Sequence, residues 1–261
     1  MSNQICKWCG EPISWRQFAR ISNAEFCLYC QTALPQGQRA TWAPQGLFRA
    51  FPAETDFAYR FANLVALHTR FAPTSRTLSL VWHHSMIVAL IAIQLHRRTA
   101  PDLDEKVIWQ AALVHDLGIY RTIDWDDRFA AEMSCYIRHG IIGGHILRRE
   151  GFPEEIARVA ERHTGVGITR EDIARQALPL PSEDYVPQSR LEELICYADK
   201  FHSKRLKFST FDEALAVERA RGTDKEQRLL EFKDKFGLPK LEFIRSVYEP
   251  WQRAFGATQN L

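Results

Sequence analysis

The 261-residue sequence lacks a long apolar run and carries little net charge. Its longest uninterrupted apolar stretch, residues 86–93, is much shorter than the roughly 18 residues that a membrane-spanning helix needs. Residues 1–20 contain two cysteines and several charges where a secretory signal would have an apolar core. The 34 basic and 32 acidic residues leave a net charge of only +2. The short apolar run argues against a membrane location, and the charge balance gives only weak support to a nucleic acid as the partner.

The six cysteines are not distributed as in a secreted, disulfide-bonded protein. Four of them form two Cys-x-x-Cys pairs within the first thirty residues: Cys6, Cys9, Cys27 and Cys30. This spacing is typical of a four-thiolate zinc site, and a module of about thirty residues buries too little apolar surface to fold without a metal. Because all four ligands are cysteine, no position is left for a substrate, and we predict a structural zinc. Thiols used in this way also predict a cytoplasmic location.

The sequence leaves two alternatives for the role of this zinc-ribbon-like module. Such modules often bind nucleic acid or protein, but only Lys7, Arg16 and Arg20 are basic among residues 1–30, which is few for a phosphate-binding surface. The alternative is a module that packs on its neighbour or mediates assembly.

The rest of the chain has the periodicity of an all-α protein. Prolines, glycines and glutamines in residues 33–52 predict a linker after the zinc module, residues 1–32. Beyond the linker, apolar residues recur at helical spacing without the alternation of strands. Ser189, Thr210 and Thr223 are each followed three residues later by Glu, a capping-box pattern that predicts helix starts near residues 190, 211 and 224. We predict a helical domain over residues 53–205 and a helical extension over residues 206–261, which packs on the domain or forms a homodimer interface.

Several helical segments of the predicted domain direct a histidine or an aspartate toward the interior. His115 and Asp116 end an apolar helix just before Gly118, and two such groups are costly to bury without compensation. The other candidates on apolar helix faces are His84, His139, His163 and Asp199. A single histidine of this kind is more often a core residue bonded to a carbonyl group. Together they indicate a metal centre.

The segments HHSMIVALIA, LVHDLGIY and LEELICYADKF resemble the HD-domain superfamily of metal-dependent phosphohydrolases, over roughly residues 75–205. The intervening segment RHGIIGGHILRREGFPEEIARVAERHTGVGI is similar to a subgroup with two additional histidines. The resemblance implies an HD-domain helical bundle with four core ligands: His84, His115, Asp116 and Asp199. It also implies that His139 and His163 bind a second ion, with Asp116 bridging both. His83 is an alternative to His84, but the following Ser85 and the Val88-Ala89 pair favour His84.

The resemblance implies hydrolysis of a phosphomonoester or phosphodiester by a metal-activated water, with Asp116 as a catalytic residue. Ligation by imidazole and carboxylate suits Mn, Fe, Co, Ni or Zn without selecting among them. Arg121 and Lys200 lie close to ligands in the sequence and are candidate catalytic residues that bind the substrate, although basic residues in such places are often only solvated. Residues 163–167 lack the GYP signature of enzymes that cleave cyclic dinucleotides. They are similar to a segment of HD enzymes acting on dinucleoside polyphosphates, which implies a nucleotide substrate.

Two other functions stay open. The six ligand positions also resemble those of HD-fold di-iron oxygenases, some of which have a Tyr and a Glu shortly before the first histidine. Neither residue occurs within residues 60–83. The second alternative is a non-catalytic adaptor whose zinc module binds a protein or RNA, although six intact ligand positions argue against it.

Overall fold

The computed structural model describes residues 63–64, 66–99, 102–122, 136–205 and 207–246. The four cysteines of the predicted zinc module and the predicted linker lie outside these residues. The chain divides into two units, of which Phe71–Leu241 contains the predicted metal ligands, and the description below concerns that unit.

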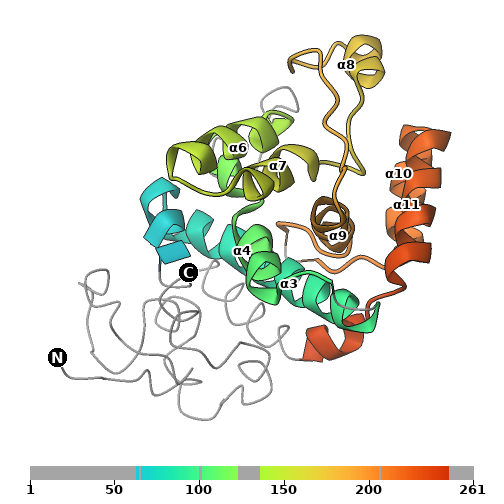
Figure 1. Ribbon diagram of the computed structural model, residues 1–261, viewed down its shortest axis with the longest axis horizontal. Coiled ribbons are helices and arrows are strands. Elements are labelled where there is room, and N and C mark those ends of the chain that lie inside the picture. The colour runs from blue at the N-terminus through green and yellow to red at the C-terminus, as the bar shows by residue number, and fades with distance from the viewer. Residues whose placement is uncertain (1–62, 65, 100–101, 123–135, 206, 247–261) are drawn as a thin grey trace. The chain divides into compact units, whose positions relative to one another are not determined.

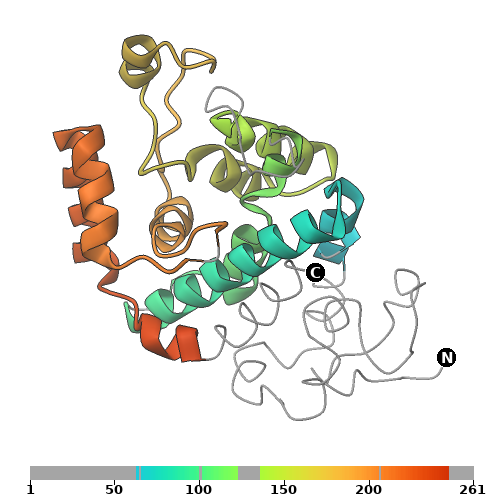
Figure 2. The same ribbon diagram turned by 180° about the vertical axis from the view of Figure 1, so that it is seen from behind.

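The described part of this unit is built from helices, which confirms the predicted all-α fold (Figures 1 and 2). Within the described residues, extended pairing is limited to the isolated bridges Ile168↔Tyr185 and His202↔Phe208. The helices are α3 (Ser75–Arg98), α4 (Glu105–Val114), the 3-10 helix η4 (Leu117–Arg121), α6 (His139–Arg149), α7 (Glu154–Arg162), α8 (Arg170–Gln176), α9 (Arg190–Asp199), α10 (Phe211–Arg221) and α11 (Thr223–Phe236).

Helix α3 is the central helix of the unit and packs against both α4 and α9. Its segment Thr77–Arg98 is long and apolar enough to cross a membrane by length and composition, but 83% of the most apolar window is buried inside the protein. Its apolar composition is therefore that of a core helix. The uninterrupted apolar run in the sequence is short because His83, His84 and Ser85 interrupt it, and all three are nevertheless buried.

The capping patterns predict two helix starts correctly and miss a third by one residue. The side chains of Ser189 and Thr210 each accept a hydrogen bond from the backbone N–H three residues later, at the starts of α9 and α10. Helix α11 begins at Thr223 itself, with Gly222 in the capping position. Because Gly222 alone joins α10 to α11, the backbone must turn there with a φ of 155°, a conformation that favours glycine.

Helix α11 packs on α9, as predicted for the extension. The ring of Tyr197 in α9 contacts those of Phe232 and Phe236 in α11, at centroid distances of 6.1 and 6.0 Å. The Tyr197 hydroxyl also donates a hydrogen bond to the carbonyl of Gly237. Helix α11 therefore supports the helix that ends in Asp199.

Candidate metal centre

The first two candidate ligands lie where α4 ends. His115 follows the last residue of α4, and Asp116 precedes η4; both side chains are fully buried. Because the helix stops here, the carbonyl of Ala112 has no helical N–H partner. It accepts a hydrogen bond from His115 Nδ1 at 2.7 Å, which directs Nε2 toward the carboxylates of Asp116 and Asp199.

Two further histidines repeat this arrangement at helix ends. His139, at the start of α6, donates from Nδ1 to the carbonyl of Tyr136 at 2.7 Å. His163, directly after α7, donates to the carbonyl of Ala160 at 2.8 Å. In each case the partner lies three residues earlier. Because a carbonyl oxygen can only accept a hydrogen bond, Nδ1 carries the proton. In the neutral rings Nε2 then carries a lone pair, and the Nε2 atoms of His139 and His163 lie 3.0 Å apart. A neutral imidazole of this tautomer is the form that coordinates a metal.

The carboxylate of Asp116 lies between two pairs of histidines. Its Oδ2 atom is 3.2 Å from His84 Nε2 and 3.4 Å from His115 Nε2. Its Oδ1 atom is 3.5 Å from His139 Nε2 and 3.3 Å from His163 Nε2. Asp116 thus presents a different oxygen to each pair, as a carboxylate shared by two ions would.

Asp199, the last residue of α9, completes the first of these groups. Its Oδ1 atom is 3.0 Å from His84 Nε2 and 3.5 Å from His115 Nε2. The structure therefore brings all six predicted ligand residues together in two groups that share Asp116: one of His84, His115, Asp116 and Asp199, the other of Asp116, His139 and His163. His83, the alternative to His84, belongs to neither group within the described residues.

The chemistry of these atoms fits divalent cations. Nε2 of His84, Nε2 of His115 and Oδ1 of Asp116 are buried and make no hydrogen bond. Each such atom costs roughly 1–3 kcal/mol when it is left without a partner. Cations bound to the two groups would supply the missing partner of each of these atoms.

The electrostatics keep Asp116, His139 and His163 in the protonation states that a metal requires. Burial by itself raises the pKa of Asp116, but the charge of Lys204, with further lowering effects, outweighs burial and holds this pKa well below its usual range. Burial, with a smaller effect from His163, lowers the pKa of His139 to about 3. Burial also lowers the pKa of His163. The pair that faces Asp116 Oδ1 is therefore neutral at physiological pH.

Two lysines contact the two carboxylates of the centre. Lys200, predicted from the sequence, lies with Nζ 3.1 Å from Asp199 Oδ2. Lys204, which the sequence analysis missed, lies with Nζ 2.6 Å from Asp116 Oδ2 and donates a hydrogen bond to the hydroxyl of Tyr136. Lys204 belongs to no helical stripe because it lies in the turns after α9, so periodicity gives no signal for it.

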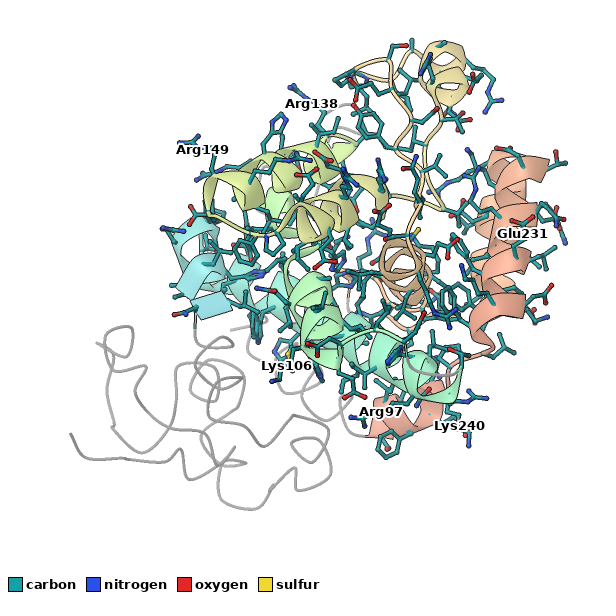
Figure 3. The ribbon with its side chains drawn as sticks, in the orientation of Figure 1. Arg97, Lys106, Arg138, Arg149, Glu231 and Lys240 are labelled. Atoms are coloured by element: carbon teal, nitrogen blue, oxygen red, sulfur yellow. The ribbon has the colours of Figure 1, made fainter. Side chains whose placement is uncertain are left out.

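Arg121, the other basic residue predicted to bind the substrate, is exposed at the end of η4. Its guanidinium lies over the ring of Phe71, 5.3 Å from the centroid. Other charged side chains, including Arg97, Arg149 and Glu231, point outward to the surface in Figure 3.

Comparison with known proteins identifies the family. The model of the HD domain matches residues 81–204, a range that contains all six candidate ligands. An uncharacterized protein of Methanocaldococcus jannaschii is 34% identical over 131 residues, which cover 48% of this chain and 69% of that protein. The chain belongs to the HD-domain family. The resemblance inferred from the sequence is thereby confirmed, and the protein is a member of a family of metal-dependent phosphohydrolases.

Two further matches differ in how much of the matched protein they cover. The tRNA (cytidine(56)-2'-O)-methyltransferase of Picrophilus torridus is 36% identical over 100 residues, which are 38% of this chain and only 25% of that enzyme. The second match is to the crystal structure of the HD domain of the L. monocytogenes phosphodiesterase PgpH. It has 16% sequence identity and a TM-score of 0.44, and it covers 76% of this chain and 97% of that chain.

A glycine two residues after Asp116 lets the two ligand groups of this HD domain approach each other. η4 packs directly on α6. A Cβ atom at Gly118 would lie 2.0 Å from the carbonyl oxygen of His139 and 2.4 Å from the backbone nitrogen of Gly143. Only a residue without a side chain permits this contact, which holds Asp116 next to His139.

Proposed function

We propose that this HD domain hydrolyses a phosphomonoester or phosphodiester of a nucleotide at a centre of two divalent cations. The observation that carries the proposal is the position of Asp116, whose two oxygens face two separate pairs of histidines. A single ion would need only one of these groups. In centres of two ions, the ions stabilise the attacking and the leaving oxygen of an in-line displacement at phosphorus, and a shared carboxylate would hold the two ions together.

Each residue of the centre has a definite role in this proposal. His84, His115 and Asp199 would hold one ion, His139 and His163 the other, and Asp116 both. When bound, the ions would supply a water of lowered pKa and neutralise the charge that develops on the phosphoryl oxygens. The backbone carbonyls that accept from Nδ1 keep three of the imidazoles in the metal-binding tautomer.

The charges of the centre favour an anionic substrate. Lys200 and Lys204 already balance the carboxylates of Asp199 and Asp116. Divalent cations would therefore leave an excess of positive charge, which a phosphate group can neutralise. We assign Lys200 and Lys204 as the cations that contact the phosphoryl oxygens. For a nucleotide as the substrate, the support is the similarity of residues 163–167 to HD enzymes acting on dinucleoside polyphosphates.

For the segments outside the described residues, we propose a structural zinc held by four thiolates, Cys6, Cys9, Cys27 and Cys30. The domain boundaries at residues 32, 52 and 205, the role of Arg121 and the cytoplasmic location likewise remain proposals from the sequence.

The proposal is tested with the full chain, depleted of metal and reloaded separately with Mn, Fe, Co, Ni or Zn. The substrates are p-nitrophenyl phosphate, bis(p-nitrophenyl) phosphate, nucleoside monophosphates, cyclic dinucleotides and dinucleoside polyphosphates. We expect phosphate-ester hydrolysis with at least one metal, and a loss of roughly 100-fold or more in Asp116→Asn. His145 is exposed on the same helix as His139, so His145→Ala is the matched control and should keep its activity.

Two results would overturn the proposal. One is phosphoesterase activity that survives in Asp116→Asn, because the activity would then come from elsewhere. The other is substrate-dependent oxygen uptake by the anaerobically iron-loaded protein without phosphate release, which would identify an oxygenase.

A further inference from the structure

The four histidines of the centre differ in the partner of their Nδ1 atom. His115, His139 and His163 lie next to helix ends and donate to a backbone carbonyl three residues earlier. His84 lies in the interior of α3, nine residues after its first residue and fourteen before its last. Carbonyl groups in a helix interior accept from the N–H four residues later, so none is available to its ring. His84 needs a partner from another element.

That partner is the imidazole of His202. Its Nδ1 atom lies 3.1 Å from His84 Nδ1, and the two rings meet through these nitrogens, with centroids 5.4 Å apart and an interplanar angle of 21°. His202 is buried, three residues after Asp199. The isolated bridge with Phe208 and the edge-to-face contact with its ring, at 4.9 Å, hold it in place.

A hydrogen bond between two imidazole nitrogens requires a proton on one of them and a lone pair on the other. Nε2 of His84 faces Asp116 Oδ2 and Asp199 Oδ1, and it must be unprotonated to coordinate a metal. The proton of His84 is then on Nδ1. His202 is left with a single role at this contact, which is to accept that proton as a neutral imidazole.

We propose that His202 is a positioning residue that fixes the tautomer and ring orientation of His84 and thereby sets the metal affinity of the group that contains Asp199. The proposal rests on the proposed function for its metal, but not on the reaction that the metal performs. His202 replaces the backbone carbonyl that serves the other three histidines. Residues that orient metal-binding histidines in this way typically change metal affinity 10- to 100-fold when they are removed.

The test compares two substitutions that separate the ring of His202 from its hydrogen-bond acceptor. In His202→Phe the ring is kept and the acceptor is lost, whereas in His202→Asn the side-chain oxygen can still accept from His84 Nδ1. Affinity of the full chain for Co²⁺ and Mn²⁺ is measured by competition with a chelator, and folding is monitored by thermal unfolding. His96→Phe is the control, because His96 is buried on the same helix but belongs to neither ligand group of the described residues.

We expect His202→Phe to bind the metal of the His84 group 10- to 100-fold more weakly, His202→Asn to remain within about 3-fold of the wild type, and His96→Phe to bind normally. Unchanged affinity in His202→Phe would overturn the proposal. An equal loss in the Phe and Asn variants would also overturn it, since the hydrogen-bond acceptor would then not be the relevant property. A wild-type protein that binds metal as expected but hydrolyses no phosphoester would refute the proposed function and leave this inference standing.

Discussion

Gly118→Ala gives the most direct test of how the fold positions the centre. A Cβ atom there would lie 2.0 Å from the carbonyl oxygen of His139, whereas real Cβ contacts essentially never fall below 3.0 Å. Relief therefore requires η4 and α6 to separate by about 1 Å or more. The atoms in the way belong to the backbone of α6 and cannot rotate aside.

The size of this movement sets the expected effects. Overpacking of this kind costs about 1–3 kcal/mol, which corresponds to roughly 2–12 °C in Tm for a chain of this length. Ligand distances in metal sites tolerate only about 0.2 Å. A shift of about 1 Å between Asp116 on one side and His139 on the other exceeds that tolerance several-fold. We expect the second ion to be lost, and the first to be kept because its ligands lie outside α6.

The assay is metal content per full-length chain, with Tm measured in parallel. Gly118→Ala should contain one ion fewer than the wild type. In the control Gly144→Ala, the new Cβ meets the side chain of Glu161, which can move, so the metal content should be unchanged. If Gly118→Ala keeps the full metal content and affinity, the argument that this glycine sets the separation of the two ligand groups is refuted.

Two further perturbations follow from buried ion pairs. Lys204→Met leaves Asp116 without its cation, so the free energy of unfolding of the metal-free protein should fall by roughly 3 kcal/mol. Excess metal should restore most of this stability, and an equal loss of stability with chelator and with metal would contradict the reasoning. Burial raises the pKa of Asp172, but the hydrogen bonds from Lys225 and Thr169 outweigh burial and hold this pKa below its usual value. Ionised Asp172 therefore stabilises the fold above about pH 4, and this contribution is lost as the pH falls through the folded pKa. Urea unfolding should therefore show Asp172→Asn to be less stable than the wild type at pH 7, with a difference that shrinks below pH 4; a difference that does not change with pH would refute this.

Much of the fold could be predicted because its signals are local. Helical periodicity and the caps at Ser189 and Thr210 depend on residues within one turn of each other, and the structure confirms them. The start of α11 was missed because tertiary structure decides it. With α10 continuing to Arg221, Gly222 alone is left for the turn, and Thr223 becomes the first helical residue instead of the cap.

The candidate site was predictable to the same extent. The six ligands lie on apolar helix faces or at helix ends, where a polar residue stands out against its surroundings. Lys204 and His202 do not stand out in this way, because they lie in the turns after α9 rather than on an apolar helix face. Helical periodicity does not determine the path of a turn. Arg121 lies five residues from Asp116 in the sequence, and its guanidinium lies over the ring of Phe71. Its contact with the substrate stays a prediction.

The position of each histidine in its helix therefore determines how much of its surroundings a sequence can show. At a helix end, the free carbonyl three residues earlier is supplied by the same segment, so the ligand and its orienting partner are encoded together, as for His115 and His163. Inside a helix every nearby carbonyl is already bonded, and the partner has to come from a distant segment. His84 is the histidine of this second kind in the described centre, and its partner is 118 residues away in the chain. The group that contains His84 thus depends on the fold beyond α9, whereas His139 and His163 are each oriented by a carbonyl three residues earlier in the chain.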